Sequence, residues 1–392
     1  MSRRELKRAL QRAAPEDPAA RERALRVVQS AYKEYEPRAR RRPWAVLLAT
    51  AVLMAAGAVG AAAASAPKSD VGRLVRDLLG VGEPRPRPVL VQVPGGGRLL
   101  VESGAGAWVV SDSGAKRRLG DYEGASLSPR GLFAVVWRGR ELMAIDPKGR
   151  VRWSLPRPQP IAVARWAPGD GFRIAYLSGG ALRIVYGDGT RDRRYGAVRA
   201  EIAPAWRPRA RHELAYVDAR GRLTVAAVDA RRRLWRGATV GRAAELLWSS
   251  AGDRLLVLMP GRLLLYDGAG RLRSSRALPA GLSAQHAVWA PRGARVAVVR
   301  RDRASNRSDV VVLNAAGGTE RFLFGRPGRF GPPAWAPDAS RLLLPLPDAD
   351  QWLFLRPDGS GRLIAVSNIA RQFTPGADPP AFPRSVQWCC AP

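Results

Sequence analysis

The stretch Ala334-Trp335-Ala336-Pro337-Asp338, followed by the apolar run Arg341-Leu342-Leu343-Leu344, decides the fold that we predict for this chain. It combines an aromatic residue, a turn containing proline and a short strand-like segment, and it is one copy of a repeat. The six copies are spaced 39, 40, 42, 41 and 46 residues apart, with onsets at Leu127, Trp166, Trp206, Trp248, Trp289 and Trp335. A period of about 40 to 45 residues that holds four short strands is typical of a β-propeller blade.

The residues within each repeat also favour an all-β fold. The second copy contains the strand-like runs Arg173–Leu177 and Leu182–Tyr186, followed by the turn Gly187-Asp188-Gly189. Short apolar runs bounded by Gly, Asp and Pro indicate strands rather than one long helix. A single four-stranded sheet of this kind cannot bury both faces, whereas a ring of stacked blades can.

The two ends of the repeat region are predicted to complete one blade together. Arg98–Val101 and Ala107–Val110 resemble the middle and outer strands of a blade, and Ser385–Trp388 resembles the inner strand that they lack. Six full units and one shared unit give a seven-bladed propeller, with six blades as the alternative count. Residues 88–93 are an alternative inner strand, which would change the closure and keep the count. Closure removes exposed sheet edges.

The motif Trp-Ala-Pro-Asp, followed by an apolar strand and a strand ending in Asp-Gly, resembles the repeat of TolB-type, WD-like propellers. The resemblance covers roughly residues 95 to 390. It implies the propeller fold and no particular activity, since propellers host many unrelated functions.

Four regions are expected along the chain. Residues 1–43 form a basic helical arm, 44–66 a transmembrane helix, 67–94 a membrane-proximal helix with a Pro-rich linker, and 95–392 the propeller. The arm carries 13 Lys or Arg and 6 Asp or Glu, and Asp17-Pro18 is a helix-start signal.

Residues 44–66 hold no charged side chain, and 23 such residues are long enough to cross a bilayer of about 30 Å. Basic residues precede this segment, next to Trp44, which predicts a cytoplasmic amino terminus and an extracytoplasmic propeller at the plasma membrane. The alternative is a secretory signal cleaved after the small residues 61–66; the long polar region before the apolar segment argues against it.

The net charge is +32, from 65 Lys and Arg against 33 Asp and Glu, and it limits the classes of binding partner to consider. The arginine excess is explained either by genome composition or by a surface for anionic lipid headgroups, cell-wall polymers or nucleic acid. Nucleic acid is disfavoured because no basic run interleaves with aromatic residues in a known motif. The arginine-rich segments Arg191–Arg194, Arg231–Arg233 and Arg300–Arg303 favour acidic partners.

No catalytic residue, metal ligand or cofactor-binding residue is assigned from the sequence. His212 and His286 are the only histidines, and we expect them to be hydrogen-bonded structural residues. The only cysteines, Cys389 and Cys390, could form a disulfide with each other or remain thiols. The repeated tryptophans are expected to pack blade against blade, and a ligand site is expected in loops at a mouth of the central channel.

A second resemblance gives an alternative function. Leu142–Trp153 looks like the docking repeat of quinoprotein-type propellers, and Ala227–Trp235 is a looser copy. In that family the tryptophan and the Asp-Gly turn hold one blade against the next. The match therefore implies the packing of blades rather than the binding of a quinone cofactor. The sequence therefore predicts a non-enzymatic binding or scaffold module for a protein or an anionic envelope partner, with an enzyme at the channel mouth as the alternative.

Overall fold

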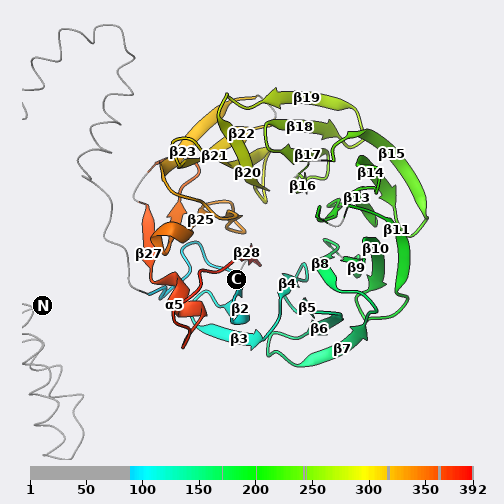
Figure 1. Ribbon diagram of the computed structural model, residues 1–392, viewed down its shortest axis with the longest axis horizontal. Helices are drawn as coiled ribbons and strands as arrows, with labels where there is room; N and C mark the ends of the chain where they lie inside the picture. The colour runs from blue at the N-terminus through cyan, green and yellow to red at the C-terminus, as the bar shows by residue number, and fades with distance from the viewer. Residues whose placement is uncertain are drawn as a thin grey trace, which may run out of the picture. The chain divides into compact units, whose positions relative to one another are not determined.

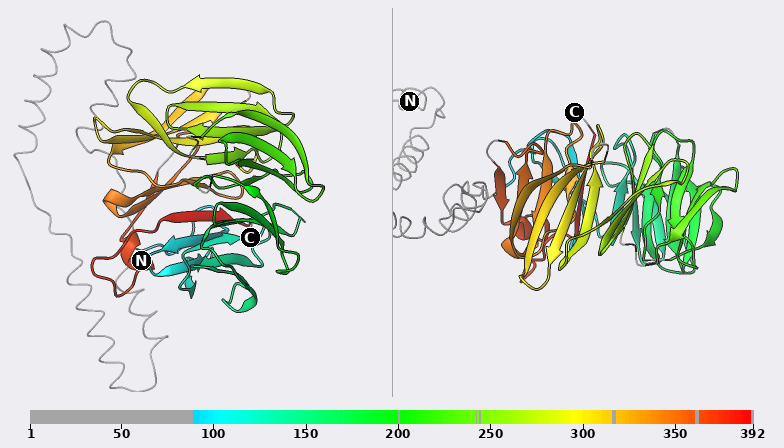
Figure 2. Two further views of the ribbon diagram at one scale, coloured as in Figure 1. Left: turned by 45° about the vertical axis from the view of Figure 1, so that its right-hand side comes forward. Right: turned by 90° about the horizontal axis from the view of Figure 1, so that it is seen from above.

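The computed structural model describes residues 89–390, except for 170, 200, 242, 244, 316, 317, 361 and 362. In this part of the chain, seven four-stranded antiparallel sheets surround a common axis (Figure 1; Figure 2). The predicted all-β, seven-bladed propeller is confirmed, and the alternative count of six is not adopted.

The blades are numbered along the chain, and their strands are given from the innermost to the outermost. Blade 1 contains β28 (Ser385–Cys389), β1 (Arg98–Ser103), β2 (Gly106–Val110) and β3 (Lys116–Gly120). Blade 2 contains β4 (Gly124–Leu127), β5 (Ala134–Arg138), β6 (Glu141–Ile145) and β7 (Val151–Pro156). Blade 3 contains β8 (Ile161–Trp166), β9 (Arg173–Ser178), β10 (Ala181–Tyr186) and β11 (Arg193–Ala197).

The remaining blades follow the same order. Blade 4 contains β12 (Ala205–Trp206), β13 (Glu213–Val217), β14 (Arg222–Ala227) and β15 (Arg232–Thr239). Blade 5 contains β16 (Glu245–Trp248), β17 (Arg254–Met259), β18 (Arg262–Asp267) and β19 (Leu272–Ala277). Blade 6 contains β20 (Leu282–Trp289), β21 (Arg295–Asp302), β22 (Arg307–Asn314) and β23 (Glu320–Pro327). Blade 7 contains β24 (Ala334–Trp335), β25 (Leu342–Leu346), β26 (Gln351–Leu355) and β27 (Ile364–Ser367), with the short helices η1 (Pro347–Ala349) and α5 (Ile369–Phe373).

The apolar pattern of each strand follows its position in the blade. The central residues Leu255–Leu258 of β17 are all buried, because the neighbouring blades cover both faces of this strand. All six residues of the outermost strand β19 are exposed. A strand buried on both faces reads as a continuous apolar run, whereas an outermost strand tolerates charge.

The repeated tryptophans pack between blades, as predicted. Three of them donate an indole hydrogen bond of 3.0 Å to a backbone carbonyl of the preceding blade: Trp206 to Arg165, Trp289 to Leu247, and Trp335 to Val288. Trp166 and Trp248 are buried too, but their Nε1 atoms have no hydrogen-bond partner among the described residues. The repeat therefore encodes blade-to-blade contacts.

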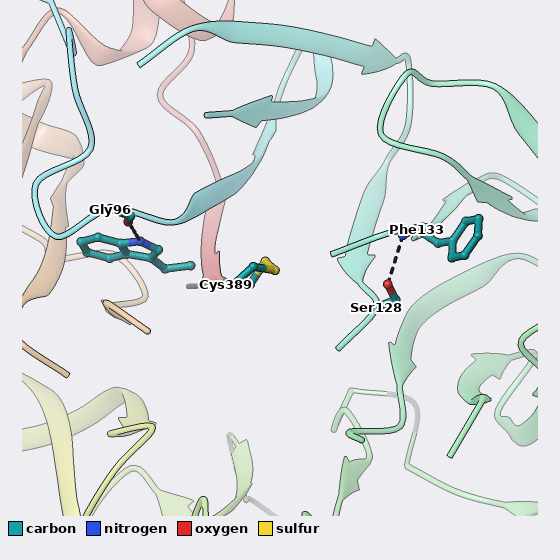
Figure 3. The surroundings of a disulfide bond; sticks show 6 residues. Gly96, Ser128, Phe133 and Cys389 are labelled. Carbon is teal, nitrogen blue, oxygen red and sulfur yellow. Dashed lines mark hydrogen bonds between the residues drawn. A yellow bond between two sulfur atoms is a disulfide. The ribbon is translucent and has the colours of Figure 1, made fainter. Parts of the chain in front are cut away.

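The ring is closed by strands from both ends of the repeat region. In the register of β1 and β28, Leu99 lies opposite Trp388 and Val101 lies opposite Val386. Trp388 donates its indole proton to the carbonyl of Gly96 at 2.8 Å (Figure 3). The predicted closure is confirmed, and the alternative inner strand at residues 88–93 is wrong, because β28 occupies that place.

The disulfide joins the adjacent residues Cys389 and Cys390 (Figure 3). The sequence left open whether these cysteines form a disulfide or remain thiols, and the structure has the disulfide. Cys390 adopts a φ of 60°, so the chain leaves the strand there and the alternation of side chains ends. A Cβ at Gly131, in the neighbouring turn of blade 2, would lie 2.5 Å from the Cys390 sulfur, so this turn needs glycine.

Three expected elements lie outside the described residues. They are the arm of residues 1–43, the transmembrane helix of residues 44–66, and the membrane-proximal helix that the sequence predicts at residues 71–79, within the region 67–94. In the part that the structure describes, no helix has the length and apolar character needed to cross a membrane.

Candidate functional site

A basic surface covers the outer edges of blades 3 and 4, where β11 and β15 lie side by side (Figure 1). We call it the basic patch. It consists of the exposed residues Arg191, Arg194, Arg231, Arg232, Arg233 and Arg236. Outermost strands pair on one side only and face solvent on the other, so charged side chains are tolerated there.

Two carboxylates near the basic patch already pair with other cations. Asp192 accepts hydrogen bonds from Arg157 at 2.8 Å and from Arg183 at 2.6 Å. The Tyr176 hydroxyl also donates to Asp192, and burial together with this bond raises the pKa of Tyr176. The carboxylate of Asp192 is therefore used by side chains within and beside blade 3, and it does not neutralise the charge of the exposed arginines.

Asp229 is engaged in the same way at the junction of blades 3 and 4. It pairs with Arg173 at 2.9 Å, with Arg193 at 3.0 Å and with His212 at 2.6 Å. Burial acts to raise the pKa of Asp229, but the hydrogen bond from Arg173 and the charges of His212 and Arg173 outweigh it, and the net pKa is lowered. Asp229 thus carries a negative charge that two arginines and the His212 ring already share.

None of the six arginines of the basic patch has an acidic partner within the described residues. Exposed arginines without a paired carboxylate generate a positive potential that attracts acidic surfaces. The patch is therefore a surface suited to an anionic partner.

Two tyrosines lie beneath these arginines. Tyr195 and Tyr216 make an edge-to-face contact with ring centroids 6.0 Å apart. Burial raises the pKa of Tyr216 to about 12, although the charges of Arg236 and Arg233 oppose the rise. Half-buried tyrosines surrounded by arginines match the composition of energetic centres in protein interfaces.

The structure brings together two of the three arginine-rich segments predicted from sequence. Arg191–Arg194 and Arg231–Arg233 contribute to the basic patch, while Arg300–Arg303 lies in blade 6. The prediction is wrong for Arg300, which is 8% exposed and hydrogen-bonded to Asp309 and Glu320. Arg236 was not singled out, although its place in the run Arg232–Thr239 could have shown it.

The two histidines have structural partners, as expected from the sequence. The ring of His212 lies 2.8 Å from the carbonyl oxygen of Gly171, and its other nitrogen faces Asp229. The Nδ1 atom of His286 lies 3.0 Å from the carboxylate of Glu245. The structure does not bring the two histidines to one site, because they lie in blades 4 and 6.

The two segments that resemble quinoprotein docking repeats join one blade to the next. Trp153 donates to the carbonyl of Gly187 at 2.8 Å, and Trp235 donates to the carbonyl of Gly268 at 3.2 Å. Both contacts run from an outermost strand to the β-turn of the following blade. These contacts account for the motif as a structural link between neighbouring blades. They give no support to the binding of a quinone cofactor.

The turn before Trp153 is held by Asp146, which is 5% exposed. Its carboxylate accepts the amides of Lys148 and Arg150 and pairs with the guanidinium of Arg150 at 2.8 Å. Burial acts to raise the pKa of Asp146, but the hydrogen bonds from Arg150 and Lys148 prevail and lower it to about 2. Asp146 therefore stabilises the fold in its ionised form.

The substitution Asp146→Asn is expected to lower the thermal unfolding temperature at pH 7. Because the folded-state pKa lies below the usual value, the stabilisation is complete above the usual aspartate range and is lost as the pH falls towards about 2. The difference in Tm between the natural chain and the variant should therefore shrink on acidification, measured by circular dichroism from pH 7 downwards. A difference that stays constant over this range would contradict the assignment.

Comparison with known proteins adds support for the fold. No protein-family model and no curated protein matches the sequence. The β-propeller domain of Myceliophteria thermophila Cps50 (Swd1) is similar, with a TM-score of 0.52 and 17% identity over 66% of this chain and 92% of that chain. A chain of the mitotic checkpoint complex is similar with a TM-score of 0.53 and 15% identity, over 70% of this chain and 91% of that chain.

A hydrazine synthase from Kuenenia stuttgartiensis is also similar, with a TM-score of 0.48 and 14% identity over 60% of this chain and 76% of that chain. The two neighbours with TM-scores above 0.5 support the shared fold, and identities this low show nothing of function. The chain is a seven-bladed β-propeller with WD-repeat-type propellers among its structural neighbours.

Proposed function

We propose that this protein is a non-enzymatic binding module whose propeller recognises an acidic protein or an anionic polymer of the cell envelope. The observation that carries the proposal is the basic patch, in which six exposed arginines on two neighbouring blades have no acidic partner among the described residues. A rigid ring of blades holds these side chains in a fixed arrangement, so that few of them are reoriented on binding. Preorganised charge gives specificity and speeds association.

An acidic protein is the partner that the patch favours over a polymer. The half-buried Tyr195 and Tyr216 offer apolar area beside the arginines, and this combination is typical of protein interfaces. A polymer that carries only charge would make little use of the tyrosine rings.

The proposal also includes a membrane anchor at residues 44–66, supported by the absence of charge in this segment and by the basic residues before it. The propeller would then lie outside the plasma membrane, and the arm of residues 1–43 would lie in the cytoplasm, where it could relay a binding event. An immunoblot against the arm tests this part: the arm should be present on the mature membrane-bound protein, and its loss would indicate a cleaved signal.

Reversing charge in the basic patch is expected to weaken partner binding. In the double variant Arg231→Glu and Arg233→Glu, we expect the affinity of the full chain to fall about tenfold or more at moderate salt, because two attractive charges become repulsive. The loss should diminish as salt rises, since salt screens exposed charges. Binding is measured by surface plasmon resonance at graded salt.

The matched control reverses two exposed arginines far from the patch, through Arg117→Glu in β3 and Arg356→Glu in blade 7. It makes the same change in net charge and should retain binding within about a factor of three, because only long-range charge is altered. If both double variants bind equally weakly, binding follows net charge and not the patch. If neither variant differs from the natural chain, the proposed function is wrong.

A further inference from the structure

A pocket of about 700 Å³ opens between blades 5 and 6. Its apolar part is formed by buried or half-buried side chains of both blades, namely Leu256, Leu263, Leu265, Trp289, Val296 and Leu313. Its polar part includes Arg254, Asp267, Arg273 and Arg276. The volume lies in the range of pockets that take small ligands or a large side chain.

Other blade junctions show which kind of group fills this place. Between blades 2 and 3, the indole of Trp153 bonds to the carbonyl of Gly187. Between blades 4 and 5, the indole of Trp235 bonds to the carbonyl of Gly268 and stacks on Tyr266 with centroids 5.8 Å apart. In both junctions a tryptophan of the outermost strand covers the turn of the next blade.

Strand register identifies Ser274 as the residue in the corresponding position of blade 5. Trp153 lies opposite Ala144, Trp235 opposite Val225, and Ser274 opposite Leu265. In all three blades the register shifts by one residue immediately beside this pair. The hydroxymethyl side chain of Ser274 thus stands where two other blades carry an indole.

The turn of blade 6 keeps the glycine that makes room for an indole. A Cβ at Gly189 would lie 2.8 Å from the Trp153 ring, and one at Gly270 would lie 2.6 Å from the Trp235 ring. Both contacts are too close for any residue but glycine. At the corresponding Gly318, whose φ is +70°, a Cβ would meet no atom of the described residues within 4 Å. The pocket reaches this glycine, whose carbonyl accepts a bond of 3.5 Å from Arg276.

Two further junctions use arginine in place of tryptophan. Arg193 donates to the carbonyl of Val228 at 3.2 Å, and Arg321 donates to the carbonyl of Asp358. In the junction of blades 5 and 6, Arg254 donates to the carbonyl of Ala315. The backbone acceptor is therefore satisfied, and the pocket lies over the leucines of this junction.

We propose that this pocket receives a tryptophan side chain from an acidic segment of a protein partner. The ring would lie over Leu265 and beside Gly318, as Trp153 and Trp235 lie in their own junctions. Arg273 and Arg276 stand at the rim with side chains 57% and 41% exposed. Each already bonds one carboxylate, but a guanidinium has five N–H donors and can bond the acidic residues on either side of the tryptophan.

This inference rests on the proposed function, because it names the part of an acidic protein partner that the propeller holds. Tryptophan and arginine are the residues that most often dominate binding energy in interfaces. A tryptophan anchored in the pocket would therefore account for specificity that the basic patch alone does not give.

The test compares two labelled peptides on the full chain by fluorescence anisotropy. One carries a single tryptophan between glutamates, and the other carries alanine in its place. We expect the tryptophan peptide to bind about tenfold more tightly, as for a buried aromatic anchor. The variant Ser274→Trp should fill the pocket with its own indole and abolish this preference.

Two further variants keep the test decisive. Ser274→Arg copies the junctions made by Arg193 and Arg321, so it should also remove the preference if Ser274→Trp does not fold. Ser275→Trp is the matched control, because neighbouring side chains of a strand point to opposite faces, and it should keep the preference.

The outcomes separate the inference from the proposed function. Equal, salt-sensitive binding of both peptides overturns the pocket assignment and leaves the basic patch in place. Absence of binding by either peptide at every salt concentration counts against both proposals. A preference that persists in both Ser274 variants places the tryptophan elsewhere, and self-association lost in Ser274→Trp, measured by sedimentation, would assign the pocket to a second copy of the chain.

Discussion

The substitution Val386→Asp is expected to unfold the whole propeller at a much lower temperature than the natural chain. Val386 is 5% exposed and lies in the cluster that joins β28 to β1 and to blade 7. An unpaired carboxylate in such a place costs several kcal/mol, whereas the total stability of a domain is only roughly 5–15 kcal/mol. Because β28 closes the ring, its loss exposes the edge of β1 in blade 1 and uncovers the cluster that packs on blade 7.

Differential scanning calorimetry measures this effect, with Val151→Asp as the control. Val151 lies on the outermost strand β7 and is 52% exposed, so the same chemical change there should cost no more than about 0.5 kcal/mol. Equal unfolding temperatures for the two variants would show that the closure by β28 does not hold the ring together.

The substitution Arg300→Met is expected to destabilise blade 6 by about 3 kcal/mol at pH 7, the lower end of the range for breaking a buried ion pair. The Arg300 side chain is 9% exposed and pairs at 2.7 Å with both Asp309 and Glu320. These carboxylates are 22% and 26% exposed, so water screens part of the loss. Burial lowers the pKa of Arg300, but its hydrogen bonds to Asp309 and the charge of Glu320 raise it overall.

Urea denaturation of the variant at two pH values checks the cause. In Arg300→Met the two carboxylates repel each other, so the destabilisation should shrink as acid protonates them. Adding Asp309→Asn and Glu320→Gln should restore much of the stability at pH 7. The control Arg303→Met changes an exposed residue directly after the same strand and should be close to neutral. If both single variants are equally stable, Arg300 contributes nothing that depends on its partners.

The sequence predicted the architecture because the contact between blades is made by one residue type at a fixed position of the repeat. Trp206, Trp289 and Trp335 recur at one position, and each bonds to the preceding blade. The fragment around Trp388 lacked partners of its own, which pointed to closure with β1. Such local patterns are visible in the sequence because every blade has to pack on the preceding one and uses the same kind of residue to do so.

Other features depend on contacts that no local pattern shows. The burial of Arg300 follows from Asp309 and Glu320, which stand on two neighbouring strands and are recognised only once the strand register is known. The bond between Cys389 and Cys390 needs a positive φ at Cys390, which adjacent cysteines do not reveal. The pocket beside Ser274 is the exception, since aligning the turns that precede Trp153 and Trp235 would have shown the missing tryptophan.

The basic patch was predictable in part. The segments Arg191–Arg194 and Arg231–Arg233 are visible as arginine runs, but their meeting on one surface requires that β11 and β15 be neighbouring outermost strands. The pairing of Asp192 and Asp229 with partly buried arginines could not be read from the sequence, and it is what leaves the patch positively charged.

Site-specific photo-crosslinking tests the central claim most directly. A photoreactive residue is placed at Arg236 in the basic patch, or at Arg117 as the control, in the full chain on native membranes. We predict covalent adducts with an acidic protein from the Arg236 position, lost as salt is raised, and few adducts from Arg117. Adducts from Arg117 alone, or adducts from Arg236 that are insensitive to salt, would contradict recognition of an acidic partner by the basic patch.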